Sequence, residues 1–177
     1  MAEHLVCESE AAPPPSFIYK RVEDMIQQPT PFASRLEESM RVVDEALDRY
    51  GEDGLALTFN GGKDCTVLLH LLCAALEKRK SVTAPTNGKR RTDRLKCLYV
   101  ENHAVFPEVE KFVAQSERQY DLDLVKIKSD MKSALRSYMD MRPGVKAFLV
   151  GTRRNDPHGT KLQYFTPSDP DWPPLMR

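Results

Sequence analysis

The hydrophobic positions of this chain follow two alternating patterns. Short apolar runs of strand length occupy residues 55–59, 95–100, 122–127 and 146–150. Between these runs, apolar residues recur every three or four positions, as they do along one face of an α-helix. Strands that alternate with helices of this length predict a parallel twisted sheet with right-handed crossovers. The expected fold class is therefore α/β, with helices on both faces of the sheet.

The helix before the first strand is predicted to begin at Ser34, because apolar residues then follow one helical face as far as Tyr50. Ser34 is the expected N-cap, and Glu37, three residues later, fits a capping box. Gly51 is expected just beyond the last turn. A shorter helix is predicted within residues 17–26.

Three more helices are predicted further along the chain. The first begins near Asp64, the second at Pro107, and the third after Asp130, which is its expected N-cap. Proline suits the first turn of a helix, where its missing N–H costs nothing. In the helix from Pro107, Phe112 and Val113 are expected to face inward.

Size and composition indicate one globular domain. The chain has 177 residues, of which 41% are hydrophobic and 29% charged, as in ordinary globular proteins. Residues 34–177 are predicted to form this domain, after a disordered or extended lead-in over residues 1–33 that contains the short helix. The late aromatic residues Tyr164, Phe165 and Trp172 are expected on a proline-rich tail with no element behind it.

Charge and hydropathy argue against several kinds of partner. Lysine plus arginine equals aspartate plus glutamate, at 26 each, so the formal net charge is zero. A neutral chain is unlike proteins that bulk charge recruits to nucleic acids or membranes. No apolar run approaches the length of a membrane span. The basic, polar segment 78–94 is predicted to be a surface loop.

The four cysteines have neither a CxxC pairing nor a metal-ligand spacing. They are therefore expected to be reduced thiols in an intracellular, cytoplasmic protein. Cys65 and Cys73 lie eight positions apart on one predicted helix, so we interpret them as packing residues. The histidines form no metal-binding pattern either.

The stretch that carries candidate chemistry follows the first strand. Asn60, Gly61 and Gly62 tolerate positive φ angles and let a ligand approach the backbone closely. The helix that begins near Asp64 turns its free N–H groups and the positive end of its dipole toward the same point, which favours phosphate. Lys63 adds a positive charge. The sequence therefore predicts an anion site here, with a spacing that differs from the Walker-type loop.

A second candidate cluster follows the fourth strand. Segment 151–157 contains two adjacent arginines, Arg153 and Arg154, and guanidinium groups bind phosphate oxygens through two parallel hydrogen bonds. Asp156 is expected to hold an arginine in position, accept from a hydroxyl or help to seat a metal. Ligands bind at the carboxyl ends of parallel strands, so both clusters and the loop from Glu101 should share one edge of the sheet.

These clusters resemble motifs of a known family. Residues 58–65 resemble the pyrophosphate loop of the ATP pyrophosphatase and phosphoadenylylsulfate reductase group, in the version found in eukaryotic FAD synthases. Residues 151–157 resemble the second motif of the same enzymes. Residues 169–173 and Arg177 resemble their downstream Trp-Pro and Arg. The resemblance covers roughly residues 36–177.

The resemblance implies a Rossmann-like fold of the adenine-nucleotide α-hydrolase type and FMN adenylyltransferase activity. This reaction transfers AMP from ATP to the phosphate of FMN and gives FAD and pyrophosphate, with Mg²⁺. The implied ATP-binding residues are Thr58, Phe59, Asn60, Gly61, Gly62, Lys63, Asp64, Cys65, Tyr99 and Val100. The implied FMN- or pyrophosphate-binding residues are Gly151, Arg153, Arg154, Asp156 and Trp172. The expected catalytic residues are Asn60, Asp64 and Asp156.

Two other functions stay open. The family continues beyond the residue that matches Arg177 with elements that cover the flavin. This chain is therefore expected to bind ATP with Mg²⁺ but to form FAD poorly. A catalytically impaired ATP-binding or regulatory protein is one alternative. A phosphoadenylylsulfate reductase is the other, although that chemistry uses a late nucleophilic cysteine and no cysteine follows Cys97.

Overall fold

The computed structural model describes residues 13–82, 94–101, 105–157 and 159–177. The predictions made for the first twelve residues, and for most of the basic segment 78–94, lie outside the described residues. In chain order the elements are α1 (Pro15–Ile26), α2 (Pro31–Tyr50), β1 (Leu55–Thr58), α3 (Lys63–Val82), β2 (Leu95–Val100), α4 (Pro107–Gln119), β3 (Leu122–Ile127), α5 (Met131–Met141) and β4 (Ala147–Leu149).

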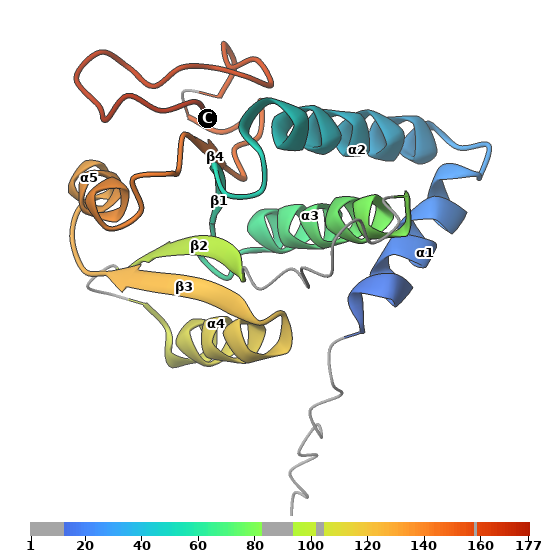
Figure 1. Cartoon of the computed structure of the whole chain (residues 1–177), viewed down its shortest axis with the longest axis horizontal. Coiled ribbons are helices and arrows are strands. Elements are labelled where there is room, and N and C mark those ends of the chain that lie inside the picture. Colours follow the sequence, from blue (N-terminus) through green and yellow to red (C-terminus); the bar gives the residue numbers. More distant parts are fainter. Residues whose placement is uncertain (1–12, 83–93, 102–104, 158) are drawn as a thin grey trace, which may run out of the picture.

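The strands form a sheet in the order β3-β2-β1-β4 (Figure 1). Each pair of neighbouring strands is parallel. The predicted fold class is therefore confirmed. The four predicted strands are also present, with β1 and β4 slightly shorter than their apolar runs.

Alternate side chains of the strands enter two hydrophobic cores, one on each face of the sheet. Leu55 and Leu57 of β1 and Cys97 of β2 belong to the larger core, which also takes side chains from α1 to α4. Ala56 of β1 and Leu98 of β2 belong to the second core, together with α5. Figure 1 shows α5 standing apart from the other helices. One face of the sheet is thus covered by several helices and the other by α5 and the chain's last segment.

Helix α2 begins earlier than the sequence predicts. Its N-cap is Thr30, whose Oγ1 accepts a hydrogen bond from the Ala33 N–H at 3.1 Å. Pro31 occupies the first helical position, where proline is well accepted. The predicted N-cap Ser34 is therefore wrong, because the first turn is set by the Thr-Pro pair rather than by the apolar stripe that starts after it. Gly51 follows the helix with a φ of 69°, as expected.

We expect Thr30→Ala to lower the free energy of unfolding by about 1 kcal/mol, the usual cost of deleting an N-cap side chain. Ser34→Ala is the matched control. Ser34 is exposed inside the helix, so its replacement should cost less than about 0.5 kcal/mol. Urea denaturation followed by circular dichroism measures both variants. Equal losses would contradict Thr30 as the cap.

Helix α1 confirms the predicted short helix and packs against the body of the protein. Its Ile18 and Val22 lie in the larger core, beside the apolar face of α3. Ala33, in the first turn of α2, is also buried. Residues 15–33 therefore contribute to the same core as the rest, and the division of the chain at residue 34 stays a prediction.

Helix α4 begins at Pro107 as predicted, but only one of its two highlighted side chains is fully inside. Val113 is 1% exposed, whereas Phe112 is 38% exposed. Val109, Val113 and Ser116 lie on one face of the helix, and Phe112 lies at the edge of that face. The Phe112 ring therefore lies at the border of the core, with its centroid 6.5 Å from that of Phe59.

The proline-rich tail is packed against the sheet, contrary to the expectation that no element lies behind it. The Phe148 N–H of β4 donates to the Met176 carbonyl at 2.8 Å, and the Met176 N–H donates to the Lys146 carbonyl at 3.1 Å. Leu175 is buried, and Trp172 packs against the same core under α5. The sequence could not predict this packing, because the tail binds the edge of the sheet through backbone hydrogen bonds. Such bonds require no recurring pattern of hydrophobic side chains.

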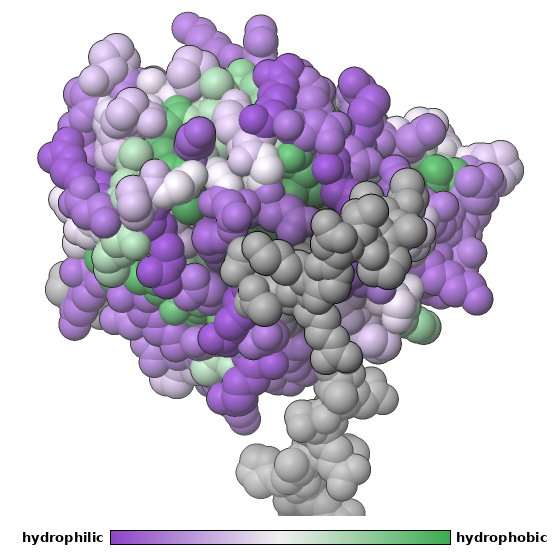
Figure 2. All heavy atoms as spheres, viewed as in Figure 1, coloured by the Kyte–Doolittle hydropathy of each residue, from purple (hydrophilic) through white to green (hydrophobic). Residues whose placement is uncertain are grey.

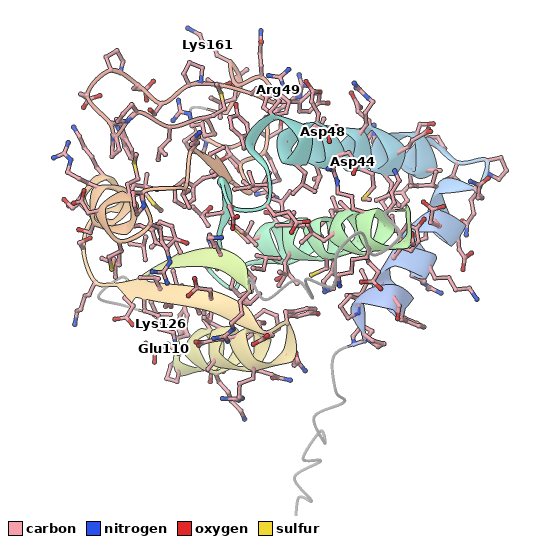
Figure 3. The ribbon with its side chains drawn as sticks, in the orientation of Figure 1. Asp44, Asp48, Arg49, Glu110, Lys126 and Lys161 are labelled. Carbon is pink, nitrogen blue, oxygen red and sulfur yellow. The ribbon has the colours of Figure 1, made fainter. Side chains whose placement is uncertain are left out.

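Polar side chains cover most of the face seen in Figure 2, and the hydrophobic residues there form small separate patches. Two labelled carboxylates of α2, Asp44 and Asp48, pair with basic residues of α3 (Figure 3). Lys78 lies 2.9 Å from Asp44, and Arg79 lies 2.7 Å from Asp48. Within the described part of the chain, no helix has the length and apolar composition needed to cross a bilayer.

Candidate functional site

The loop between β1 and α3 is short and is held in one shape. Gly61 has a φ of 73°, a left-handed value that glycine adopts without strain. The Gly62 N–H donates to Asn60 Oδ1 at 2.9 Å, so Asn60 closes the turn with its own side chain. A Cβ built on Gly61 would lie 3.0 Å from Val113 Cγ2. The loop therefore also packs against α4.

The two predicted clusters meet at the carboxyl edge of the sheet. Strands β1 and β4 are parallel neighbours, so the segments that follow them leave the sheet side by side. A Cβ built on Gly151, just after β4, would lie 3.0 Å from Cys65 Sγ and 3.2 Å from the Cys65 backbone nitrogen. Gly151 therefore lies directly against the first turn of α3. This is the common edge that the sequence predicts.

An ion-pair network joins the two clusters. The Arg153 N–H donates to Asp156 Oδ2 at 2.7 Å, and its Nε and Nη2 donate to Asp156 Oδ1 at 3.2 and 3.1 Å. Arg153 Nε also lies 3.6 Å from Asp64 Oδ2 in the first turn of α3. The backbone hydrogen bond from Arg153, followed by that from its side chain, lowers the pKa of Asp156. The side-chain hydrogen bond to Asp156 raises the pKa of Arg153.

The two adjacent arginines do not act as one pair. Arg153 is engaged by Asp156 and Asp64, whereas the Arg154 guanidinium lies over the ring of Tyr164, 6.0 Å from its centroid. The Tyr164 hydroxyl donates to Glu38 Oε1 of α2 at 2.8 Å. The edge of the sheet therefore presents two guanidinium groups in different surroundings.

Comparison with known proteins identifies the family. The model of the phosphoadenosine phosphosulfate reductase domain matches residues 54–147, which are more than half of the 177-residue chain. The chain belongs to this family. The matched residues run from the end of the turn before β1 to the first residue of β4, so they contain β1, β2, β3 and the first cluster.

The chain as a whole is similar to FAD synthases. It is 35% identical to a probable FAD synthase of Schizosaccharomyces pombe over 144 residues, 81% of this chain and 53% of the relative. The crystal structure of yeast FAD synthetase in complex with FAD matches it with a TM-score of 0.77 and 25% identity, over 92% of this chain and 60% of that one. Candida glabrata FMN adenylyltransferase, in complex with FAD and inorganic pyrophosphate, gives a TM-score of 0.79 at 22% identity, over 92% and 61%. The chain thus spans about half the length of the Schizosaccharomyces relative.

Several residues predicted to bind ATP have side chains that are buried in the hydrophobic core. Phe59 is 1% exposed, Tyr99 4% and Cys65 7%. Burial raises the pKa of the Cys65 thiol. These side chains stabilise the core, so a ligand contact at these positions requires the backbone. Their assignment to ATP stays a prediction.

Three other predicted residues have packing partners of their own. Thr58 Oγ1 donates to the Leu149 carbonyl at 3.2 Å and so ties β1 to β4 beside the site. Val100 is half-buried at the end of β2. Trp172 packs against the second core with α5. A contact between Trp172 and FMN stays a prediction.

Polar side chains remain accessible around the loop. Asn60 and Lys63 are exposed, and Asp64 is half-buried. Among the described residues, no three His, Cys, Asp or Glu side chains converge as a metal site. Magnesium in nucleotide sites is commonly held by one or two carboxylates together with the phosphates. Asp64 beside a triphosphate fits that pattern.

Sequence reasoning missed two residues near the second cluster, Tyr164 and Glu38. They are 126 positions apart in the chain and meet through one hydrogen bond. Tyr164 stands in the tail without a motif around it, and Glu38 is one of many charged residues on α2. No local signal in the sequence connects them, because their contact is created by the fold.

Proposed function

We propose that the protein is an FMN adenylyltransferase, which transfers AMP from ATP to FMN and releases pyrophosphate. One observation carries the proposal: the two clusters that resemble FAD synthase motifs are joined through Arg153, Asp156 and Asp64. The names of the similar proteins support it, because they include FAD synthases and an FMN adenylyltransferase. The magnesium requirement and the residue roles below belong to the same proposal.

In this proposal the loop between β1 and α3 binds the ATP triphosphate. The left-handed Gly61 lies directly before the first turn of α3, and the N–H groups at a helix N-terminus suit phosphate oxygens. Lys63 neutralises part of the charge. Asn60 and Asp64 lie next to the reacting phosphates, and the backbone at Tyr99 and Val100 borders the adenine. Magnesium, when bound with ATP, would further neutralise the phosphate charge, and Asp64 would be the carboxylate that helps to hold it.

The acceptor side is built from the segment after β4. An oxygen of the FMN phosphate attacks the α-phosphorus of ATP, and the bond from that phosphorus to the oxygen that bridges the α- and β-phosphates breaks. The electron pair of the broken bond leaves with pyrophosphate. Because the FMN phosphate is already an anion, the step requires positioning and charge stabilisation more than a base. Arg153 and Arg154 bind the phosphates, and Asp156 holds Arg153.

A reductase reaction, which the family name suggests, is less well supported. It requires an accessible, reactive thiolate. Cys65, Cys73 and Cys97 are all buried, and burial raises the pKa of both Cys65 and Cys97. The thiols described in this chain are therefore packing residues. Free buried thiols are typical of reducing compartments, so we propose the cytoplasm as the location.

The test is a labelling assay on the purified 177-residue chain. ATP labelled at the α-phosphate is mixed with FMN and Mg²⁺, and the products are separated by chromatography. We expect only slow transfer of the label to FAD, and no labelled product with riboflavin, which has no phosphate to act as acceptor. Calorimetric titration of ATP with Mg²⁺ is run in parallel. Binding of ATP without labelled FAD would favour the impaired ATP-binding protein, and no binding of ATP would contradict both.

A further inference from the structure

The two guanidinium groups at the site differ in which of their surfaces is occupied. A guanidinium donates hydrogen bonds from its edges, whereas its flat faces stack on aromatic rings. Arg153 uses its Nε and Nη2 edge on Asp156. Arg154 instead has its guanidinium carbon over the ring of Tyr164, 6.0 Å from the ring centroid, at the outer range of a cation–π contact. Such a contact uses none of the Arg154 N–H donors, so they can bind phosphate oxygens.

The ring of Tyr164, beneath Arg154, is held by a hydrogen bond to helix α2. The Tyr164 hydroxyl donates to Glu38 Oε1 at 2.8 Å, so α2 sets the position of the ring. Two contacts therefore link α2 to Arg154: Glu38 holds Tyr164, and Tyr164 contacts Arg154. Tyr164 itself is 50% exposed, so burial in the core does not account for its place.

Phe165, the next residue after Tyr164, makes a second contact with α2. Phe165 packs against the larger core, and the Arg49 guanidinium lies 4.2 Å from its ring centroid. Arg49 projects from α2 on the same side of the molecule as Lys161 (Figure 3). Two adjacent aromatic residues thus reach α2 at Glu38 and at Arg49, which are three turns apart on one helix. The coil that carries Tyr164 is held along α2 rather than at one point.

We infer that Tyr164, held by Glu38, is a positioning residue that holds the Arg154 guanidinium through a cation–π contact and leaves its N–H donors for the pyrophosphate group of the substrate. The inference rests on the proposed function, because it assigns Arg154 to the phosphates of that site. It separates the two arginines by role: Arg153 joins the two clusters, and Arg154 is the one whose donors are available. The ligand chemistry required is a pyrophosphate or phosphate oxyanion.

A double-mutant cycle tests the inference on the full chain, with inorganic pyrophosphate as the probe. We expect Tyr164→Leu to weaken pyrophosphate binding about two- to fivefold, the range of an exposed cation–π contact. Tyr164→Phe keeps the ring but loses the hydrogen bond to Glu38, so it should recover only part of the affinity. In the Arg154→Met background, Tyr164→Leu should have no further effect. That loss of effect is the decisive readout, because a merely structural role of Tyr164 would persist without Arg154.

Phe165→Leu is the matched control, because it changes the neighbouring aromatic that lies beneath Arg49. It should lower the unfolding temperature and leave pyrophosphate affinity within about twofold. Equal effects of Tyr164→Leu with and without Arg154 would overturn the inference and leave the proposed function standing. If the parent chain binds neither pyrophosphate nor ATP with Mg²⁺, the inference and the proposed function both fail.

Discussion

Gly151→Val should weaken binding of ATP with Mg²⁺ by about five- to 150-fold, the size expected when an overpacked contact costs about 1–3 kcal/mol. The added Cβ would lie 3.0 Å from Cys65 Sγ, 3.2 Å from the Cys65 nitrogen and 3.3 Å from the Asp64 carbonyl carbon. Two of these atoms are backbone of the first turn of α3. The segment after β4 must therefore move away from the loop between β1 and α3, which is proposed to bind the triphosphate. Calorimetric titration measures the affinity.

Two variants check the cause of this loss. Gly144→Ala is the control, because a Cβ there would meet its nearest atom, the Asp53 carbonyl oxygen, at 3.9 Å; it should bind ATP as the parent does. Cys65→Ala combined with Gly151→Val removes the nearest contact, and part of the affinity should return. Unchanged ATP binding in Gly151→Val would show that the two clusters need not touch.

Asp156→Asn should lower the rate of FAD formation about a hundredfold, as expected when a reacting group loses its fixed orientation, and change ATP affinity less than about threefold. The Asp156 carboxylate accepts from the Arg153 backbone and from two side-chain nitrogens of the same arginine. An amide has one oxygen and directs its own N–H groups at some of these donors. Arg153 would then lose its fixed position between the clusters.

Asp123→Asn provides the comparison, because Asp123 also binds an arginine with both oxygens. Arg142 Nε and Nη2 donate to it at 3.2 and 2.9 Å. This pair joins β3 to the end of α5, away from the segment after β4. Its loss should reduce stability without slowing the reaction. A rate of FAD formation in Asp156→Asn equal to that of the parent would remove Asp156 from the proposed mechanism.

Local patterns in the sequence predict the framework of the fold because they depend on neighbouring residues. The apolar runs predict all four strands, and Asp130 caps α5 through a hydrogen bond from the Ser133 N–H, as expected. The start of α2 is different. Its apolar stripe begins after the first turn, and the Thr30 cap with Pro31 precedes any residue that the stripe includes.

Features that depend on distant contacts could not be predicted in the same way. Met176 pairs with β4 through its backbone, and backbone pairing needs no recognisable side-chain sequence. The two arginines are adjacent in the chain and identical in type, and Asp156 follows both within three residues, so the sequence does not tell which of them the carboxylate holds. Their difference comes from Asp156 and Asp64 on one side and from Tyr164 on the other. The sequence predicts that the two clusters share one edge of the sheet, but it does not predict the orientation of their charged side chains.

The pairing of β4 with β1 also determines when the site can exist during folding. Leu55 pairs with Ala147, more than ninety positions further along the chain, whereas β2 pairs with β3 across a much shorter stretch. Closing a longer loop costs more chain entropy, and contacts between distant residues form slowly. We therefore expect β1, β2 and β3 with their helices to assemble before β4 arrives. The loop between β1 and α3 would then form before Gly151 and the arginines lie beside it. If the proposed site needs both segments, the ability to bind ATP would appear only in the last step of folding.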